Sequence, residues 1–254
     1  MIRRTAVSAI AFVAAILLST AVLAQPPDLG NKPRWSLGVA VISSPEPYVD
    51  ADNDVLVVPA LSFEYKKFYF RGIYAGYTLW EQGGFQADAV LRPRFEGYEE
   101  DDSPFLRGME DRRISADLGL ELQWEGERIG VSLTPTTDIL DRSGGQEVAL
   151  LLYSPIRFGP VRVEPRVGVA WQSADLTDYY FGVRPEEARP DRSAYEPGAA
   201  LNLTGGVFVF SPVYRRLLFQ GFLRVDQLDD DIEASPIVGD GQAVVGFVSL
   251  SYAF

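Results

Sequence analysis

The chain ends in Val244-Val-Gly-Phe-Val-Ser-Leu-Ser-Tyr-Ala-Phe254, and this stretch decides the predicted fold. Even-numbered residues form an apolar face, whereas serines interrupt the odd-numbered face, which is the period of a β-strand with two different environments. A final strand that ends on an aromatic residue is typical of bacterial outer-membrane β-barrels. We expect its apolar face to act as the barrel-assembly signal. That signal comprises Val248, Leu250, Tyr252 and Phe254.

The chain begins with the features of an export signal. Arg3 and Arg4 precede an apolar run over residues 6–18, and small residues at Val22 and Ala24 fit cleavage after Ala24. We therefore predict a cleaved signal peptide over 1–24, a short periplasmic segment over 25–33 and an outer-membrane barrel over 34–254. The expected location is the outer membrane of a Gram-negative cell.

Composition excludes several classes of function. The formal net charge is −12, and loss of the two arginines in residues 1–24 makes it −14, which argues against nucleic acid as a partner. The chain contains no cysteine and no histidine. Disulfides, thiolate chemistry, Ser-His and Cys-His catalysis and histidine-bound metals are thereby excluded. We expect a protein that is not an enzyme, with no catalytic, metal-binding or cofactor-binding residues.

Strict alternation over 114–124 and 161–171 predicts two further strands, each long enough to cross a bilayer at a tilt. A soluble barrel or sandwich would show the same period with its apolar face turned inward. The length of these strands favours a membrane barrel, because strands of soluble sheets are shorter. Trp124 and Trp171 at their ends suit an interfacial aromatic girdle.

The whole pattern predicts an all-β, antiparallel transmembrane barrel. Even strand numbers are usual, so twelve strands is the nearest count, with ten as the alternative, and we expect the parity to fail near 43–54. Long outer connectors are expected at 97–111, 139–145, 174–195 and 228–242, and short periplasmic turns near Gly83-Gly84, Gly126, Gly159-Pro160 and Pro212. The strand ranges that we predict are 34–43, 55–66, 67–80, 85–96, 112–124, 127–138, 146–157, 160–173, 196–210, 213–227 and 243–254.

Charged residues on the polar faces of these strands are expected to point into the lumen. They could line a selective channel, or they could pair with one another and fill the space. We favour pairing, because a twelve-strand barrel leaves little room beside arginine and glutamate. The predicted lumen charges are Arg113, Asp117, Glu121, Arg162, Glu164, Arg166 and Arg224.

Acidic clusters mark three of the connectors. Residues 50–54 resemble the start of a calcium loop, but Val55 stands where that loop needs glycine and Leu61 where it needs glutamate. We expect solvated loops, with loose divalent bridging to lipopolysaccharide phosphates as the functional alternative. The clusters are Asp50, Asp52 and Asp54; Glu99, Glu100, Asp101 and Asp102; and Asp229, Asp230 and Asp231.

The connector 174–195 carries exposed aromatics, which indicate either a self-packed loop or a contact surface. Its motif Asp178-Tyr-Tyr-Phe-Gly-Val183, followed by Glu187-Ala188, resembles the signature of the MipA/OmpV family of outer-membrane proteins. The resemblance extends over 35–254 and departs from the family at 45–48. Supporting motifs are Val57-Val-Pro-Ala-Leu61, Phe70-Arg-Gly72, Arg142-Ser-Gly-Gly-Gln146, Gly159-Pro160 and Ser251-Tyr-Ala-Phe254. The signature residues are Asp178, Tyr179, Tyr180, Phe181, Gly182 and Glu187.

This resemblance implies a scaffold for peptidoglycan-remodelling enzymes, with a lytic transglycosylase and a penicillin-binding protein as the implied partners. Outer-membrane lipid and lipopolysaccharide would surround the barrel. A narrow porin-like channel for solute uptake and a surface adhesin are the alternatives that the family leaves open. No enzymatic residues are implied.

Overall fold

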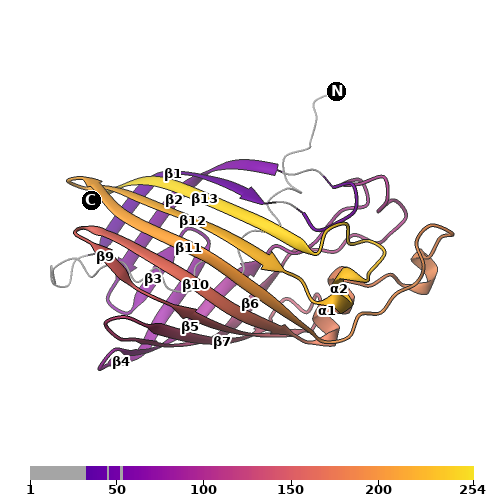
Figure 1. Ribbon diagram of the computed structural model, residues 1–254, viewed down its shortest axis with the longest axis horizontal. Coiled ribbons are helices and arrows are strands. Elements are labelled where there is room, and N and C mark those ends of the chain that lie inside the picture. The colour runs from indigo at the N-terminus through magenta and orange to yellow at the C-terminus, as the bar shows by residue number, and fades with distance from the viewer. Residues whose placement is uncertain (1–32, 45, 52–53) are drawn as a thin grey trace.

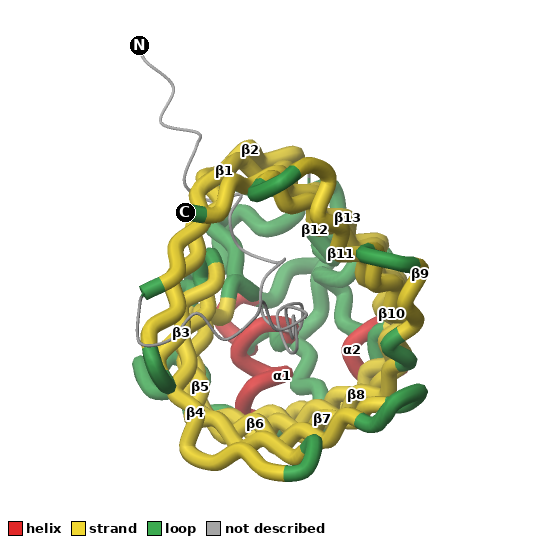
Figure 2. The backbone as a smooth tube through the Cα atoms, turned by 90° about the vertical axis from the view of Figure 1, so that its left-hand side faces the viewer, coloured by secondary structure: helices red, strands yellow, loops and turns green. Residues whose placement is uncertain are grey.

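A computed structural model describes residues 33–44, 46–51 and 54–254; the predicted signal peptide and nearly all of 25–33 lie outside this part of the chain. The described chain forms an antiparallel sheet rolled into a barrel (Figures 1 and 2). Its strands are β1 (Arg34–Ser44), β2 (Asp54–Tyr65), β3 (Phe68–Arg71), β4 (Tyr74–Gln82), β5 (Phe85–Arg94), β6 (Ser115–Glu125), β7 (Gly130–Asp138), β8 (Gln146–Tyr153), β9 (Ile156–Phe158), β10 (Val161–Gln172), β11 (Ala200–Tyr214), β12 (Leu217–Gln227) and β13 (Gln242–Ala253). Short helices α1 (Ala174–Phe181), η2 (Pro185–Glu187) and α2 (Asp230–Glu233) lie in the long loops.

The final strand closes the barrel against the first. β13 pairs with β1 from Ser36↔Ala253 to Ser43↔Gly246, and the amide of Phe254 donates to the carbonyl of Trp35 at 2.9 Å. β8 and β9 both pair with β10, so they form one wall strand interrupted between them. The wall therefore has twelve strands, as predicted.

The strand predicted over 67–80 is wrong, because the chain reverses within it. Gly72 adopts a φ of +68° between β3 and β4, a conformation that glycine enters without strain. This hairpin supplies the twelfth strand, so the parity does not fail near 43–54. The turn expected at Pro212 is also displaced: Pro212 lies inside β11, and the chain turns after Tyr214.

Because β3 is only four residues long, parts of its neighbours lack a strand partner on that side of the described wall. The last contact of β2 there is the carbonyl of Leu61, which accepts from Gly72 at 2.7 Å. Pro59 follows on the same side, and Pro93 holds the matching place on β5, two residues past the Leu91↔Ala75 pair. At both edges a proline, which has no N–H, thus stands where the amide of another residue would have no strand partner.

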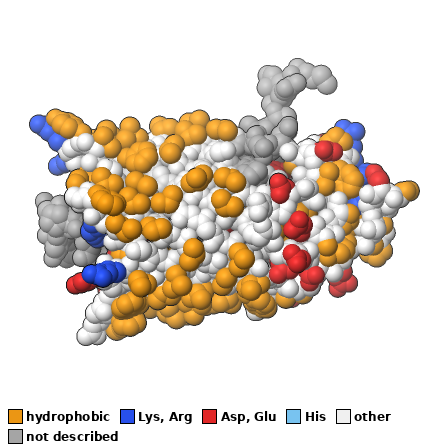
Figure 3. All heavy atoms as spheres, in the orientation of Figure 1, with side chains coloured by type: hydrophobic (Ala, Val, Ile, Leu, Met, Phe, Trp, Pro, Cys, Tyr) orange, Lys and Arg blue, Asp and Glu red, His pale blue; other side chains and the backbone are white. Residues whose placement is uncertain are grey.

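The apolar faces point outward. Leu120 is 46% exposed, whereas Asp117 and Glu121 on the opposite face are 1% and 3% exposed. Trp124 and Trp171 lie on the same outward face, and apolar side chains cover the visible barrel wall in Figure 3. This arrangement confirms the membrane barrel and excludes the soluble alternative, which would bury the leucines. Among the described residues, no helix is long and apolar enough to span a bilayer.

Leu120→Arg is expected to destabilise the folded barrel by about 2–4 kcal/mol, because it places a charge against hydrocarbon near the midplane. Leu120→Phe is the matched control and should change stability little. Urea titrations of the barrel refolded into lipid vesicles would measure both. Equal stability of the two variants would mean that this face does not meet lipid.

Candidate functional site

The long loops meet over one end of the barrel and form a structure that we call the cap, comprising residues 46–51, 95–114, 173–199 and 228–241. Figure 2 views the barrel from the opposite, short-turn end and shows α1 and α2 within the outline of the strand ring. The cap has a hydrophobic cluster, which reaches the barrel wall only at Ala200, the first residue of β11. This cluster comprises Tyr48, Tyr98, Leu106, Met109, Leu176, Tyr180, Phe181, Val183, Ala200, Leu228, Ile232, Ile237 and Val238.

The signature aromatics pack inward. Tyr180 is 1% exposed, and its carbonyl accepts a hydrogen bond from the hydroxyl of Tyr48 at 3.4 Å. The carbonyl of the next residue, Phe181, accepts from the hydroxyl of Ser235 at 2.6 Å. Each bond joins α1 to a different outer loop. The segment 174–195 is therefore an ordered loop whose aromatics pack against the other loops of the cap, which is closer to the first of the two interpretations offered for them.

Gly182 ends α1 at a point of close approach. Its amide donates to the carbonyl of Asp178 at 2.9 Å. A Cβ at Gly182 would collide with that carbonyl and with the carboxylate of the same residue. The glycine of the signature thus allows the chain to leave the helix tightly, which directs the next residues towards η2.

Glu187 is held by Arg112 in the centre of the cap. Its side chain is 5% exposed and accepts from Nη1 and Nη2 of Arg112 at 3.1 and 2.9 Å. The backbone amides of Glu110 and Arg184 donate to the same carboxylate at 2.9 and 3.0 Å. Arg112 also donates from Nε to the carbonyl of Tyr179 at 2.7 Å. This ion pair joins the loop after β5 to the loop after α1.

The electrostatic environment favours the ionised form of Glu187. Burial by itself raises the pKa of this carboxyl, but the hydrogen bonds from Arg112 and from the backbone amides outweigh it and lower the pKa below its ordinary value. Glu187 therefore stabilises the cap as an anion.

The prediction that Arg113 lies in the lumen is wrong, and the alternation gave no indication that Arg112 has a buried partner. Arg113 is exposed and precedes β6, which begins only at Ser115. The prediction extended the alternation of 114–124 back to Arg113, but the strand starts only at Ser115 and the backbone before it lies outside the wall. Arg112, one residue earlier, pairs inside the cap.

The other predicted lumen charges lie inside the barrel in groups. Arg92 and Arg94 donate to the two oxygens of Glu147 at 2.9 and 3.2 Å, and both also pair with Asp117. Of these four residues only Asp117 was predicted. The signal for the other three was weaker, because Pro93 and a run of leucines obscure the alternation of β5 and β8.

A second group joins β6 to β10. Arg162 pairs with Glu125 at 2.6 Å and with Glu164, and Glu164 also pairs with Arg166. Glu121 accepts from the hydroxyl of Tyr74 at 2.6 Å. Arg224 stands apart on β12, with Asp226 at 2.6 Å. Apart from Glu121, which is bound to a tyrosine, these charges thus lie in pairs, the arrangement favoured over a continuous selectivity lining.

The acidic clusters of the loops do not converge on one another. Where the structure describes them, no group of three or more histidine, cysteine, aspartate or glutamate side chains is placed to hold a metal ion. The side chains of Asp52 and Asp54 lie outside the described residues. Asp229 instead begins α2, where its side chain accepts from the amide of Asp231 at 3.0 Å.

Comparison with known proteins gives a consistent result. The family described as "MltA-interacting protein MipA" matches residues 37–254. The MltA-interacting protein of Escherichia coli (strain K12) is 27% identical over 234 residues, which are 87% of this chain and 90% of that protein. Outer membrane protein OmpV of Vibrio cholerae is 29% identical over 157 residues, 62% of this chain and 61% of that protein. A solved anion-selective porin from Comamonas acidovorans has a TM-score of 0.40 and 9% identity, covering 88% of this chain and 99% of the porin.

Glu187→Gln should weaken the closed cap by about 1.5–3 kcal/mol, because it removes charge-assisted hydrogen bonds that Arg112 cannot replace. Glu186→Gln is the matched control, since Glu186 is exposed beside it. Cleavage of the outer loops by proteinase K in the folded barrel would measure cap opening. Equal cleavage of both variants would show that the pair does not hold the cap.

The lowered pKa of Glu187 gives the cap a pH dependence of known sign. Its contribution is complete above the ordinary glutamate pKa of about 4.3 and is lost as the pH falls below that value. Hydrogen exchange of the cap amides should therefore rise on acidification in the wild type relative to Glu187→Gln at the same pH. An identical pH profile in both proteins would contradict the assignment.

Proposed function

This chain belongs to the MltA-interacting protein MipA family and forms an outer-membrane barrel, and on that premise we propose that it is a non-enzymatic scaffold for peptidoglycan-remodelling enzymes. Its work would be to hold partners at the membrane, not to conduct solutes. The observation that supports this proposal is the closed mouth: a packed cap lies over a lumen crossed by buried ion pairs.

A general porin needs a continuous aqueous path. Here the path would have to separate the cap loops and pass between charged side chains that already neutralise one another. Breaking a buried pair is costly because each partner is left as an uncompensated charge. The arrangement thus supports a barrel that keeps its closed state.

The end with the short turns is the surface available to periplasmic partners, since outer-membrane barrels place short turns on that side. Exposed basic side chains gather there, as Figure 3 shows at the end opposite the cap. They fit a partner with an acidic surface. The exposed basic residues of these turns include Lys66, Lys67, Arg128, Arg157, Arg215 and Arg216.

The identity of the partner is drawn from the family. The Escherichia coli relative is named MltA-interacting protein, which points to a lytic transglycosylase, and a penicillin-binding protein would be the second member of the assembly. Neither partner requires a large periplasmic domain if a ring of basic turns supplies the contact. Surface adhesion through the acidic cap is a separate activity that this proposal does not need.

A narrow channel is the second candidate, because two cavities remain in the lumen beside Arg224. Conductance decides between the two functions. We expect purified barrel in planar bilayers to show little steady current at moderate salt, with brief openings that become more frequent at high salt as the ion pairs are screened. Stable, uniform conductance steps would place the channel first.

Co-purification tests the scaffold. Lys66→Glu combined with Arg216→Glu should reduce the recovery of murein hydrolases and synthases with the barrel from solubilised envelopes. Arg107→Glu combined with Arg142→Glu makes the same charge change on exposed residues of the outer loops and should not reduce it. Recovery that is absent in the wild type, or equal in both variants, would refute the contact through basic turns.

A further inference from the structure

Arg224 differs from the other lumen arginines in what surrounds it. It is 8% exposed, and among the described residues its Nε and Nη1 have no hydrogen-bond partner. The hydroxyl of Thr204 and Oδ1 of Asp226 are also buried without a partner. Donors and an acceptor therefore stand unsatisfied together, whereas buried polar groups are usually paired.

The register of the strands explains the free donors. Arg224 lies opposite Gly206 on β11 and opposite Val245 on β13, so neither cross-strand neighbour has a polar side chain. Asp226, two residues along β12, occupies only Nη2, through its Oδ2 at 2.6 Å. A Cβ at Gly206 would lie 2.5 Å from the carbonyl oxygen of Leu223, so the glycine allows β11 and β12 to approach closely and places no side chain beside the arginine.

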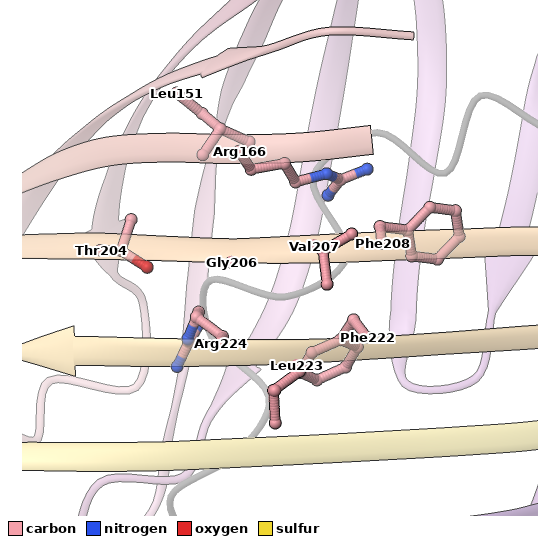
Figure 4. Close-up of a pocket in the computed structure, with 9 residues that line it drawn as sticks. All are labelled: Leu151, Arg166, Thr204, Gly206, Val207, Phe208, Phe222, Leu223 and Arg224. Carbon is pink, nitrogen blue, oxygen red and sulfur yellow. The ribbon is translucent and has the colours of Figure 1, made fainter. Parts of the chain in front are cut away.

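Two cavities share Arg224 and Thr204. The first contains Phe208, Phe222 and Leu151; Figure 4 shows Phe222 and Arg224 on one strand and Thr204 and Phe208 on the next. The second cavity is lined by more polar residues, among them Asp226, Gln172, Asn202 and Glu96. Aromatic rings thus lie on one side of the unsatisfied donors, with the guanidinium of Arg166 4.8 Å from the ring centre of Phe208, and carboxylates lie on the other side.

We infer that this place is a binding site for a small zwitterion with an apolar side group, that is, an apolar α-amino acid. The carboxylate of the ligand would accept from Arg224 and Thr204, as guanidinium donors recognise carboxylates. Its ammonium group would donate to Oδ1 of Asp226, and its side chain would lie on Phe208 and Phe222. The unsatisfied groups of Arg224, Thr204 and Asp226 would then each have a partner.

The cap covers this site. Phe181 and Leu228, both of the cap cluster, contribute to the wall of the polar cavity. Opening of the cap is therefore the route by which a ligand from outside reaches Arg224. Glu187→Gln, which loosens the cap, should speed binding without changing the contacts made by the bound ligand.

The test uses the folded full-length barrel in detergent and L-leucine as the probe, followed by titration calorimetry and ligand-observed NMR. We expect saturable binding, with 3-methylbutylamine and 4-methylpentanoate binding much more weakly because each lacks one pole of the zwitterion. Arg224→Met should weaken leucine binding about tenfold or more, the loss expected for charged hydrogen bonds. Arg216→Met, at an exposed turn, is the matched control and should bind as the wild type does.

Thr204→Val provides a second variant should Arg224→Met fail to fold, and it should also weaken leucine binding. Two results would overturn the site: no saturable leucine binding in either the wild type or Glu187→Gln, or equal affinity for leucine and 4-methylpentanoate. This inference does not depend on the scaffold. Loss of leucine binding in Arg224→Met with co-purification unchanged would separate the two.

Discussion

Charge pairing inside a closed, poorly solvated lumen is the constraint on which the rest of this structure depends. A charged side chain on the inner face of the wall has no access to bulk water, so it must find a partner within the lumen. Glu147 on β8 meets this requirement by receiving both Arg92 and Arg94 from β5. The pairing links strands that do not adjoin in the sheet, so it fixes the shape of the barrel cross-section as well as its charge.

The cap follows the same rule. Its loops are long and polar, and nothing in their local sequence would hold them across the mouth. Arg112 and Glu187 supply one buried, hydrogen-bonded pair, and the guanidinium of Arg112 lies over the ring of Tyr179 on α1. The residues of the signature motif thus have separate roles in the cap. Its aromatics pack in the hydrophobic cluster, its glycine allows the tight turn after α1, and its glutamate forms the ion pair with Arg112.

Much of the barrel wall was predictable, because lipid outside and charge inside impose opposite chemistry on alternate residues. The facing of β6, β10 and β13 followed directly from that alternation. The reversal between β3 and β4 could not be predicted in this way, because aromatic and small residues continue on both sides of Gly72. A single glycine is the only local signal of the turn. The choice between Arg112 and Arg113 was equally hidden, since it depends on where β6 leaves the wall, which loop contacts determine. Glu147 was missed because the run of leucines in β8 obscures the alternation of that strand.

Pairing is least complete around Arg224, where a glycine stands opposite the arginine on β11. Along β5, β6, β8 and β10, long charged side chains face one another and use the space between them. Along β11, Gly206 stands where a partner for Arg224 would stand. Because a glycine stands there, Nε and Nη1 of Arg224 lack a partner and a cavity remains beside them. The lumen therefore contains one region of paired charges and another with space for a ligand. A scaffold that works through its periplasmic turns does not require that region, so the proposed amino-acid site rests on the unsatisfied groups around Arg224 and not on the scaffold.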